Sequence, residues 1–450
     1  DRCADPAALL SPVPLPAAPI AGQVGAIDRD LERARVLLLT GRPEARSLAV
    51  EAVAGARRLA YPPLLARALL VLGRVEMGSP SRQDALPPLD EAIRLALAAG
   101  DDALAVEAFA RRAWVDATSP APDFERAVAG LPLVEALASR LGPGERFARA
   151  LLYNNLGGVE LARGSRPAAR AAFERALVES RGVTGPGSIE LAKLPAHLAL
   201  VVDDPGRSTA LFAQVIDELT GALGRDHPMT LEVRIMAGVM APDPAASRRI
   251  LEPACSACTR LHPTFGMRAA DCWFEVGWLA QERGDVDGVA TAMEEVVSAA
   301  ARGADPRRAD LARAHIALAR GRNAAALAGF ADVVRQVGPL ADQPWWIVWI
   351  AGEAELGAGL SHRASGQARA AEAALDRSLV HFERVASAQP ATYIQRRLAR
   401  VRAELARLRA ARGASRSEIA PLARAAADWY RAAGGQEATL DRLAPLTVER

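Results

Sequence analysis

Hydrophobic and polar positions follow the period of an α-helix along most of the chain, and one arrangement of large and small residues returns several times. Three copies have two large residues three apart, then a glycine, and later two apolar residues four apart. They are Leu69, Leu72 and Gly73 with Ala85 and Leu89; Tyr153, Leu156 and Gly157 with Ala169 and Phe173; and Trp273, Val276 and Gly277 with Val289 and Met293. In each copy the glycine precedes the second pair by 12 residues, and Ala314, Ala326 and Phe330 repeat this spacing. The fixed offset predicts repeated pairs of helices.

The small residues explain how such pairs could form. Because they lack a side chain, Gly73, Gly157 and Gly277 would let the two helices of a pair approach closely. A second glycine lies five residues before the second helix in three copies, at Gly164, Gly284 and Gly321. A glycine there can adopt the left-handed conformation that ends a helix. Since one pair cannot bury both of its faces, we expect the pairs to stack into an array.

Weaker copies of the arrangement fill the rest of the chain. The additional pairs are predicted at 31–39 with 44–60, 103–116 with 124–141, 189–202 with 208–223, 230–240 with 245–261, 345–356 with 367–385, and 393–412 with 418–433. About ten pairs result, which predicts an all-α fold, a right-handed α-solenoid. Residues 28–412 would form the array and 413–450 a terminal capping pair and tail. Five prolines from Pro6 to Pro19 predict an extended linker over 1–27 and exclude a membrane-spanning helix there.

The repeat resembles the tetratricopeptide repeat, whose first helix reads large-x2-Leu-Gly and whose second reads Ala-x3-Phe, as at 153–173. The Asn154-Asn155-Leu156-Gly157 opening and the Leu-Gly-Arg-Asp-His-Pro turn at 223–228 are similar to repeats of the kinesin-light-chain type. The Asp-Arg-Cys-Ala-Asp start, the proline-rich segment after it and Leu-Leu-Leu-Thr-Gly-Arg at 37–42 resemble the C-terminal tails of large bacterial serine/threonine protein kinases. This resemblance implies a protein-interaction module that serves as the regulatory tail of such a kinase.

Composition narrows the possible functions. The 450 residues are 50% hydrophobic and 24% charged, with a net charge of +2, so the chain is neither of disordered type nor basic enough to indicate nucleic acid as a partner. Its single lysine, Lys193, follows Ala192, whereas a phosphate-binding loop requires lysine after glycine. The H-R-D and D-F-G motifs of protein kinases and the G-x-S-x-G elbow of hydrolases do not occur. We therefore predict a chain that is not an enzyme and needs no cofactor.

Cys255, Cys258, His262 and Cys272 form the strongest candidate for metal chemistry. Three thiols and an imidazole are a suitable ligand set for structural zinc. However, His262 belongs to a His-Pro turn that His227 repeats without cysteines, and the cysteines lie where small apolar residues belong on predicted helices. Four cysteines in a chain of this length make no disulfide framework, which favours a reducing, cytoplasmic compartment. We therefore predict buried thiols, with zinc or a redox pair at Cys255 and Cys258 as weaker alternatives.

Partner binding is expected on the concave face that first helices form in such arrays. The candidate residues are Leu151, Asn154, Asn155 and Gly158, all on one predicted first helix. The kinesin-light-chain resemblance implies that Asn155 contacts the backbone of a bound peptide. Val71 and Glu275 stand at the corresponding positions of other copies, so an asparagine ladder is broken. A solvated or locally bonded Asn155 is the alternative.

Two clusters near the C-terminus are further candidates. Trp345 and Trp349 share one helical face and Trp346 an adjoining face, so the three could form a partner or dimer surface; packing between irregular units is the favoured alternative. Seven arginines lie between Arg396 and Arg412, with Glu404 as the only acid among them. Because few aromatic residues are interleaved, we predict a solvated helical face rather than a nucleic-acid site.

Taken together, these features predict a scaffolding module that holds a protein or peptide in its groove, with contact to an upstream kinase domain. A domain that senses a small molecule or peptide within a transcriptional or signalling regulator is the second hypothesis. A catalytic chain is a third, which the missing motifs disfavour. Neither nucleic acid nor membrane is expected as a partner, and the predicted location is cytoplasmic.

Overall fold

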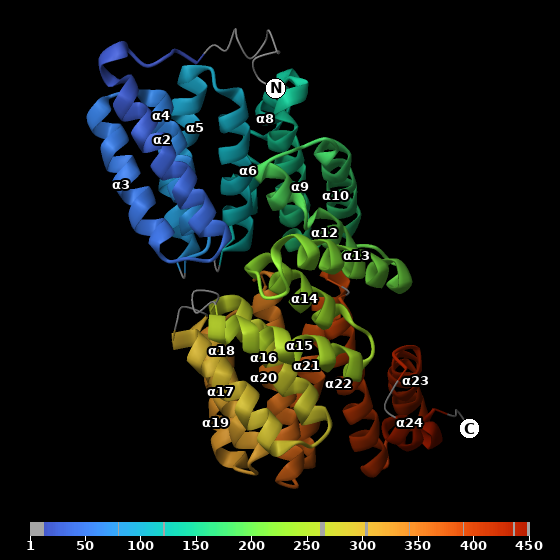
Figure 1. Cartoon of the computed structure of the whole chain (residues 1–450). Helices are drawn as coiled ribbons and strands as arrows, with labels where there is room; N and C mark the ends of the chain where they lie inside the picture. The colour runs from blue at the N-terminus through green and yellow to red at the C-terminus, as the bar shows by residue number, and fades with distance from the viewer. Residues whose placement is uncertain are drawn as a thin grey trace. The chain divides into compact units, whose positions relative to one another are not determined.

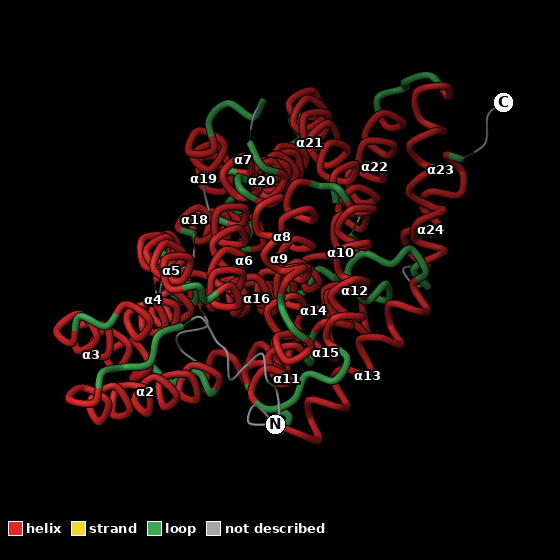
Figure 2. Tube along the Cα trace, turned by 90° about the horizontal axis from the view of Figure 1, so that it is seen from above, coloured by secondary structure: helices red, strands yellow, loops and turns green. Residues whose placement is uncertain are grey.

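The computed structural model describes residues 13–447, apart from residues 80, 120–121, 262–265, 302–304, 342, 390 and 435–436. The described residues form helices, turns and short 3-10 segments, and no strand occurs among them (Figure 2). They fall into two compact units, Asp1–Val233 (unit 1) and Arg234–Arg450 (unit 2), and the division lies within helix α14 (Pro228–Met240). The predicted all-α helical-repeat fold is therefore confirmed.

Unit 1 consists of successive helix pairs (Figure 1). These are α2 (Ala18–Leu39) with α3 (Glu44–Leu59), α4 (Pro62–Glu76) with α5 (Leu86–Ala99), α6 (Asp102–Thr118) with α7 (Phe124–Val128) and α8 (Leu131–Arg140), α9 (Arg146–Arg163) with α10 (Arg166–Ser180), and α11 (Pro186–Leu191) and α12 (Leu194–Ala199) with α13 (Pro205–Leu223). The first helices contact one another in the order α2, α4, α6 and α9, and we call them the first-helix layer. Second helices such as α3 and α5 also contact the first helix that follows, which closes the core between pairs.

Unit 2 repeats this arrangement. Its pairs are the C-terminal part of α14 with α15 (Pro244–Leu261), α16 (Gly266–Glu282) with α17 (Val286–Ala301), α18 (Pro306–Ala319) with α19 (Asn323–Val337), α20 (Trp345–Ala364) with α21 (Ala368–Ala388), and α22 (Thr392–Ala411) with α23 (Arg416–Ala432); α24 (Glu437–Leu443) follows. The first helix α18 contacts both α16 and α20. Within the described residues the two units contain the ten pairs that the spacing predicts.

The small residues allow the close approach that their spacing predicts. A methyl group on Gly157 would lie 2.5 Å from the ring of Phe173, and one on Gly73 would lie 2.6 Å from Leu89. Such distances are well inside van der Waals contact, so each glycine is required by the second helix of its own pair. Gly164 has a φ of 86° and ends α9, as predicted for a glycine that stops the first helix.

Two predicted helices are broken in the structure, which corrects their boundaries. The segment predicted at 124–141 divides into α7 and α8 at Gly130, whose φ of 84° no helix can contain. The segment predicted at 189–202 divides into α11 and α12 between Leu191 and Leu194. Proline occupies the first turn of α12, where its missing amide costs no hydrogen bond. Because of the second break, α11 and α12 do not share one helix axis.

The extended linker predicted over 1–27 is too long. Helix α2 begins at Ala18, and Pro19 lies in its first turn, where a proline favours a helix start. Residues 20–27 contain no proline, and Val24 is buried among the helices that follow. Residues 1–12 lie outside the described part of the chain.

Candidate functional site

Four charged side chains meet on the first-helix layer of unit 1, and we call them the inner cluster: Arg74 of α4, Glu107 and Arg111 of α6, and Glu190 of α11. Each carboxylate oxygen of Glu190 accepts a hydrogen bond from a different arginine, at 2.8 Å from Arg74 and 2.8 Å from Arg111. Arg111 also donates to Glu107 at 2.7 Å. The two guanidinium groups therefore hold one carboxylate between two neighbouring pairs of the array.

The electrostatics of this site are dominated by the two arginines. Burial by itself would raise the pKa of the Glu190 carboxyl, but Arg111 and Arg74 outweigh that effect and lower it to about 2. The Glu190 side chain keeps 18% of its surface exposed, whereas Arg111 keeps only 6%. The two arginines thus enclose one carboxylate, and Glu190, which carries it, is the most accessible member of the inner cluster.

The segment that carries Glu190 is short and follows two glycines. Gly182 and Gly185 before α11 have φ values of 81° and 68°, in the left-handed region that favours glycine. Among the helices of unit 1, α11 makes its main contact with α9. Glu190 follows Arg74 by 116 residues, so this short helix reaches back across the first-helix layer to an earlier pair.

The residues predicted to bind a partner lie on α9 in the same layer. Leu151 is buried at 3% exposure and Asn155 at 6%. The amide of Asn155 donates to the backbone carbonyl of Ala110 at 3.0 Å, so it joins α9 to α6. The Oδ1 atom of Asn154 lies 2.7 Å from Nδ1 of His197 in α12, which makes Asn154 the link to the next pair.

The fourth predicted residue, Gly158, is partly buried. A methyl group at this position would lie 3.0 Å from Trp114 of α6, so Gly158 also serves a helix contact. All four residues therefore have structural partners in unit 1. Their role in partner binding stays a prediction.

Unit 2 places an ion cluster at the position that corresponds to Asn155. Glu275 of α16 accepts hydrogen bonds from Arg396 at 2.6 Å and from Arg397 at 3.0 Å, both in α22. Arg397 also donates to Glu353 of α20 at 2.7 Å, and its guanidinium lies 3.9 Å from the ring centre of Trp278. Arg396, Arg397 and Glu353 are fully buried. Burial raises the pKa of Glu353 against the influence of Arg397.

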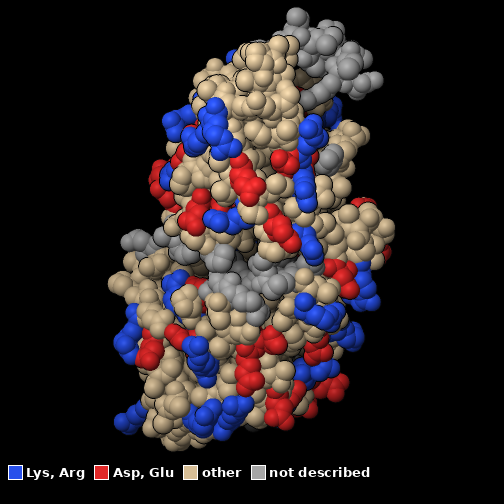
Figure 3. All heavy atoms as spheres, turned by 60° about the vertical axis from the view of Figure 1, so that its left-hand side comes forward, with Lys and Arg blue, Asp and Glu red and all other residues tan. Residues whose placement is uncertain are grey.

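This cluster corrects the prediction of a solvated arginine face. The first two arginines of the run lie inside unit 2, because the carboxylates they require come from α16 and α20. The later ones are paired on the outside: Arg402 with Glu383, and Arg409 with Glu372 and Asp376. On the face that Figure 3 shows, acidic and basic side chains lie interspersed, and neither sign forms a broad patch.

The tryptophan cluster packs within unit 2. Trp349 is buried at 6% exposure and meets Phe274 edge to face, with ring centres 5.3 Å apart. Trp345 and Trp346 are partly buried and meet edge to face at 5.7 Å. This geometry agrees with the packing alternative, and a partner surface at Trp345 and Trp346 stays a prediction.

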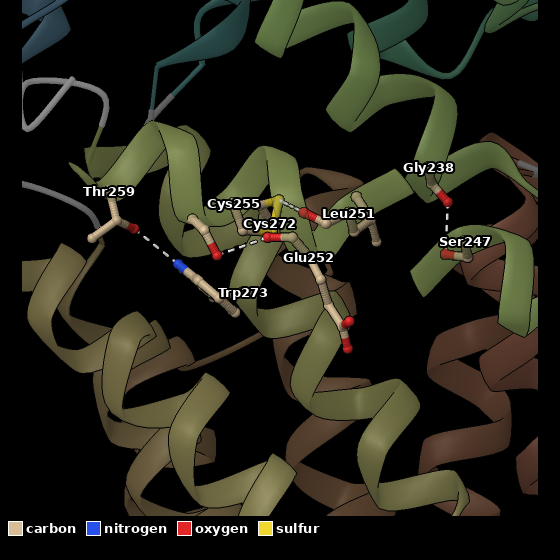
Figure 4. Close-up of a disulfide and its surroundings, with 9 residues drawn as sticks. Gly238, Ser247, Leu251, Glu252, Cys255, Thr259, Cys272 and Trp273 are labelled. Atoms are coloured by element: carbon tan, nitrogen blue, oxygen red, sulfur yellow. Dashed lines mark hydrogen bonds between the residues drawn. A yellow bond between two sulfur atoms is a disulfide. The ribbon is translucent and has the colours of Figure 1, made fainter. Parts of the chain in front are cut away.

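The cysteines differ from their predicted state. Cys255 of α15 and Cys272 of α16 form a disulfide, and both are fully buried (Figure 4). The prediction of buried thiols is therefore wrong for this pair and holds for Cys258, which is buried outside the disulfide. Because two of the three proposed sulfur ligands are bonded to each other, the zinc alternative and the Cys255–Cys258 redox pair are also wrong. His262 lies outside the described residues.

A polar cleft of about 570 Å³ lies elsewhere in unit 1, between α8, the 3-10 turn Pro143–Glu145, α9 and α10, and we call it the outer cleft. Its lining includes Glu135, Ser139, Arg146, Arg149, Tyr153, Arg175 and Glu179. Neither this cleft nor the inner cluster is visible in the sequence pattern. The only local signs were the glycines at Gly130, Gly142, Gly144, Gly182 and Gly185, which interrupt the helices beside both sites.

Comparison with known proteins gives likenesses only among solved structures. No protein-family model matches the chain, and no curated protein matches it. The Rap protein complexed with competence and sporulation factor has a TM-score of 0.49 at 15% identity, covering 86% of this chain and 100% of that one. Yeast Tom70 has a TM-score of 0.36 at 12% identity, covering 95% of each chain. The Cut9–Hcn1 complex has a TM-score of 0.31 at 11% identity, covering 98% and 99%.

Because these TM-scores lie below 0.5, we assign the fold from the helix pairs described above and not from the similar structures. Among the described helices, none is long and apolar enough to cross a membrane.

Proposed function

We propose that the chain is a protein-interaction module and that the first-helix layer of unit 1 binds a segment of a partner protein. The observation that carries the proposal is the inner cluster, in which Arg74 and Arg111 each hold one oxygen of the same carboxylate. Charge-assisted pairs of this kind give both strength and direction to recognition. The carboxylate comes from a short segment that two glycines precede, so a partner's Asp or Glu can take its place.

A selection from a peptide library tests this proposal without knowledge of the partner. Short random peptides displayed on phage are selected against the full chain, and the enriched sequence is synthesised with a fluorescent label. We expect an acidic peptide whose binding slows hydrogen exchange in α4, α6 and α9. Enrichment of no peptide, or slowed exchange only in other helices, would contradict the proposal.

The finer assignment is the regulatory tail of a bacterial serine/threonine protein kinase, located in the cytoplasm. Its support is the resemblance of the opening segment and of residues 37–42 to such tails. The gene sequence upstream of Asp1 tests it. Kinase motifs there would support the tail, whereas a DNA-binding domain would instead support a transcriptional regulator.

A second candidate function is ligand sensing, and the outer cleft is the observation that favours it. Its volume of about 570 Å³ falls within the range of about 300–1,000 Å³ that is usual for small-molecule sites. Its lining is polar, and two neighbouring pairs of the array supply it. The ligand class follows from the charges of that lining.

A further inference from the structure

The outer cleft is lined in part by α8, the second half of the interrupted helix of the third pair. Gly130 divides that helix, and α8 packs against α6. The turn Pro143–Glu145 then leads into α9, which provides Arg146, Arg149 and Tyr153, while α10 provides Arg175 and Glu179. The cleft is therefore built from two consecutive pairs and lies apart from the residues of the inner cluster.

The charges of the lining leave a local excess of positive charge. Arg149 is neutralised by Glu179, whose carboxylate accepts its Nε–H at 2.8 Å. Arg146 donates to the backbone carbonyl of Arg181 at 3.0 Å and keeps its charge without a carboxylate partner among the described residues. Arg175 is exposed, and no described carboxylate lies within ion-pair distance of it.

Arg175 is nevertheless held in place. Its guanidinium carbon lies 3.7 Å from the centre of the Tyr153 ring, a stacking distance that fixes the plane of the group. A stacked guanidinium without an acidic partner can offer its donors to an incoming anion.

Tyr153 supplies a further hydrogen-bond donor to the cleft. Its side chain is buried to 5% exposure and lines the cleft, yet its hydroxyl makes no hydrogen bond to another described residue. Burial raises the pKa of this hydroxyl, so it stays protonated and can donate. The hydroxyl is not among the fully buried polar atoms that lack a partner, so water reaches it and a ligand in the cleft can replace that water.

We propose that the outer cleft binds a small organic anion, whose carboxylate or phosphate group accepts hydrogen bonds from Arg175, Arg146 and the Tyr153 hydroxyl. Glu135 lines the same cleft without an ion-pair partner among the described residues, and it can accept a hydrogen bond from a hydroxyl or ammonium group elsewhere on the ligand. Carboxylates and phosphates share this chemistry, so the experiment must separate them.

Isothermal titration of the full chain tests the site with named probes. Citrate and succinate represent carboxylates, and inorganic phosphate and AMP represent phosphates. We expect at least one probe to bind with a Kd below about 1 mM. That affinity should fall by about tenfold or more in Arg175→Met and by a smaller factor in Tyr153→Phe, which removes one donor and keeps the ring.

Arg170→Met is the matched control. Arg170 lies on the same helix and pairs with Glu174 at 3.0 Å outside the cleft, so its loss should leave the affinity unchanged. The proposal is overturned if no probe binds below about 1 mM, or if Arg170→Met weakens binding as much as Arg175→Met does. Circular dichroism of each variant shows whether a loss reflects unfolding, and a folded Arg175→Met chain with unchanged affinity also overturns the proposal.

Discussion

Replacing Arg397 by methionine should destabilise unit 2 by about 3–5 kcal/mol, the usual cost of removing one partner from a buried ion pair. Arg397 is fully buried and bridges Glu353 at 2.7 Å and Glu275 at 2.8 Å. In the variant, Arg396 still pairs with Glu275 at 2.6 Å, but Glu353 keeps no ion-pair partner among the described residues. The cost therefore arises mainly from one stranded carboxylate.

Urea unfolding followed by tryptophan fluorescence measures this cost, because every tryptophan except Trp114 lies in unit 2. For a unit of this size, 3–5 kcal/mol corresponds to a fall in Tm of about 6–20 °C. Arg402→Met is the control, since Arg402 and Glu383 form an exposed pair that should be worth less than about 1 kcal/mol.

A double variant separates charge from packing. Arg397→Met with Glu353→Gln removes the stranded carboxylate and should recover part of the lost stability. If the double variant is no more stable than Arg397→Met, the loss comes from packing against Trp278 and the electrostatic account is wrong. The account is also wrong if Arg397→Met costs no more than Arg402→Met.

Three further outcomes follow from the contacts. Gly157→Ala should cost about 1–3 kcal/mol in thermal unfolding, because its methyl group would overlap Phe173, whereas Gly144→Ala has open space and should be nearly neutral. Cys272→Ser should lower the free energy of unfolding by about 3 kcal/mol, since it opens a loop of 17 residues. In the wild-type chain, thiol titration without a reducing agent should find no reactive thiol at Cys272. Glu190→Gln should lower stability by at most about 3 kcal/mol, because two arginines depress the pKa of Glu190. The difference in unfolding free energy between Glu190→Gln and the wild type should be complete above pH 4.5 and should vanish as the pH falls through about 2. A difference that stays constant between pH 4.5 and pH 2 would refute the pairing of Glu190 with the arginines.

The local sequence pattern is sufficient to predict the helix pairs. Gly157 and Phe173 are close in the chain, so the requirement that one be small and the other large is visible as a fixed spacing. Glycine turns such as Gly164 are equally local. The four candidate residues lie on α9, a first helix as the spacing predicts, but the spacing could not show that Asn155 joins α9 to α6.

The charged clusters could not be found this way. Arg397 and Glu275 are 122 residues apart, and nothing near either one shows that the other will neutralise it. A run of arginines with one acid therefore predicts a solvent-exposed helical face. In the folded chain, carboxylates from distant parts of the sequence pair with these arginines. Glu190 was hidden for a second reason, because the break before Leu194 changes the direction of its helix.

The disulfide is an intermediate case. The contact between α15 and α16 brings Cys255 against Cys272, and the sequence shows both cysteines on predicted helices. Apolar residues, Ala68 and Leu152, occupy the position of Cys272 in other copies, so the residue types alone could not separate a bond from two packed thiols. Disulfides are rare in the cytosol, and this bond gives no support to the predicted cytoplasmic location.

The affinity of the library-selected acidic peptide for the wild type and for Glu190→Gln tests the central claim most directly. If Arg74 and Arg111 form the partner site, removing the charge that occupies it should tighten binding by about tenfold. Glu179→Gln breaks an ion pair of the outer cleft and should leave that affinity unchanged. Equal binding by the wild type and Glu190→Gln would contradict the claim that the inner cluster receives the partner.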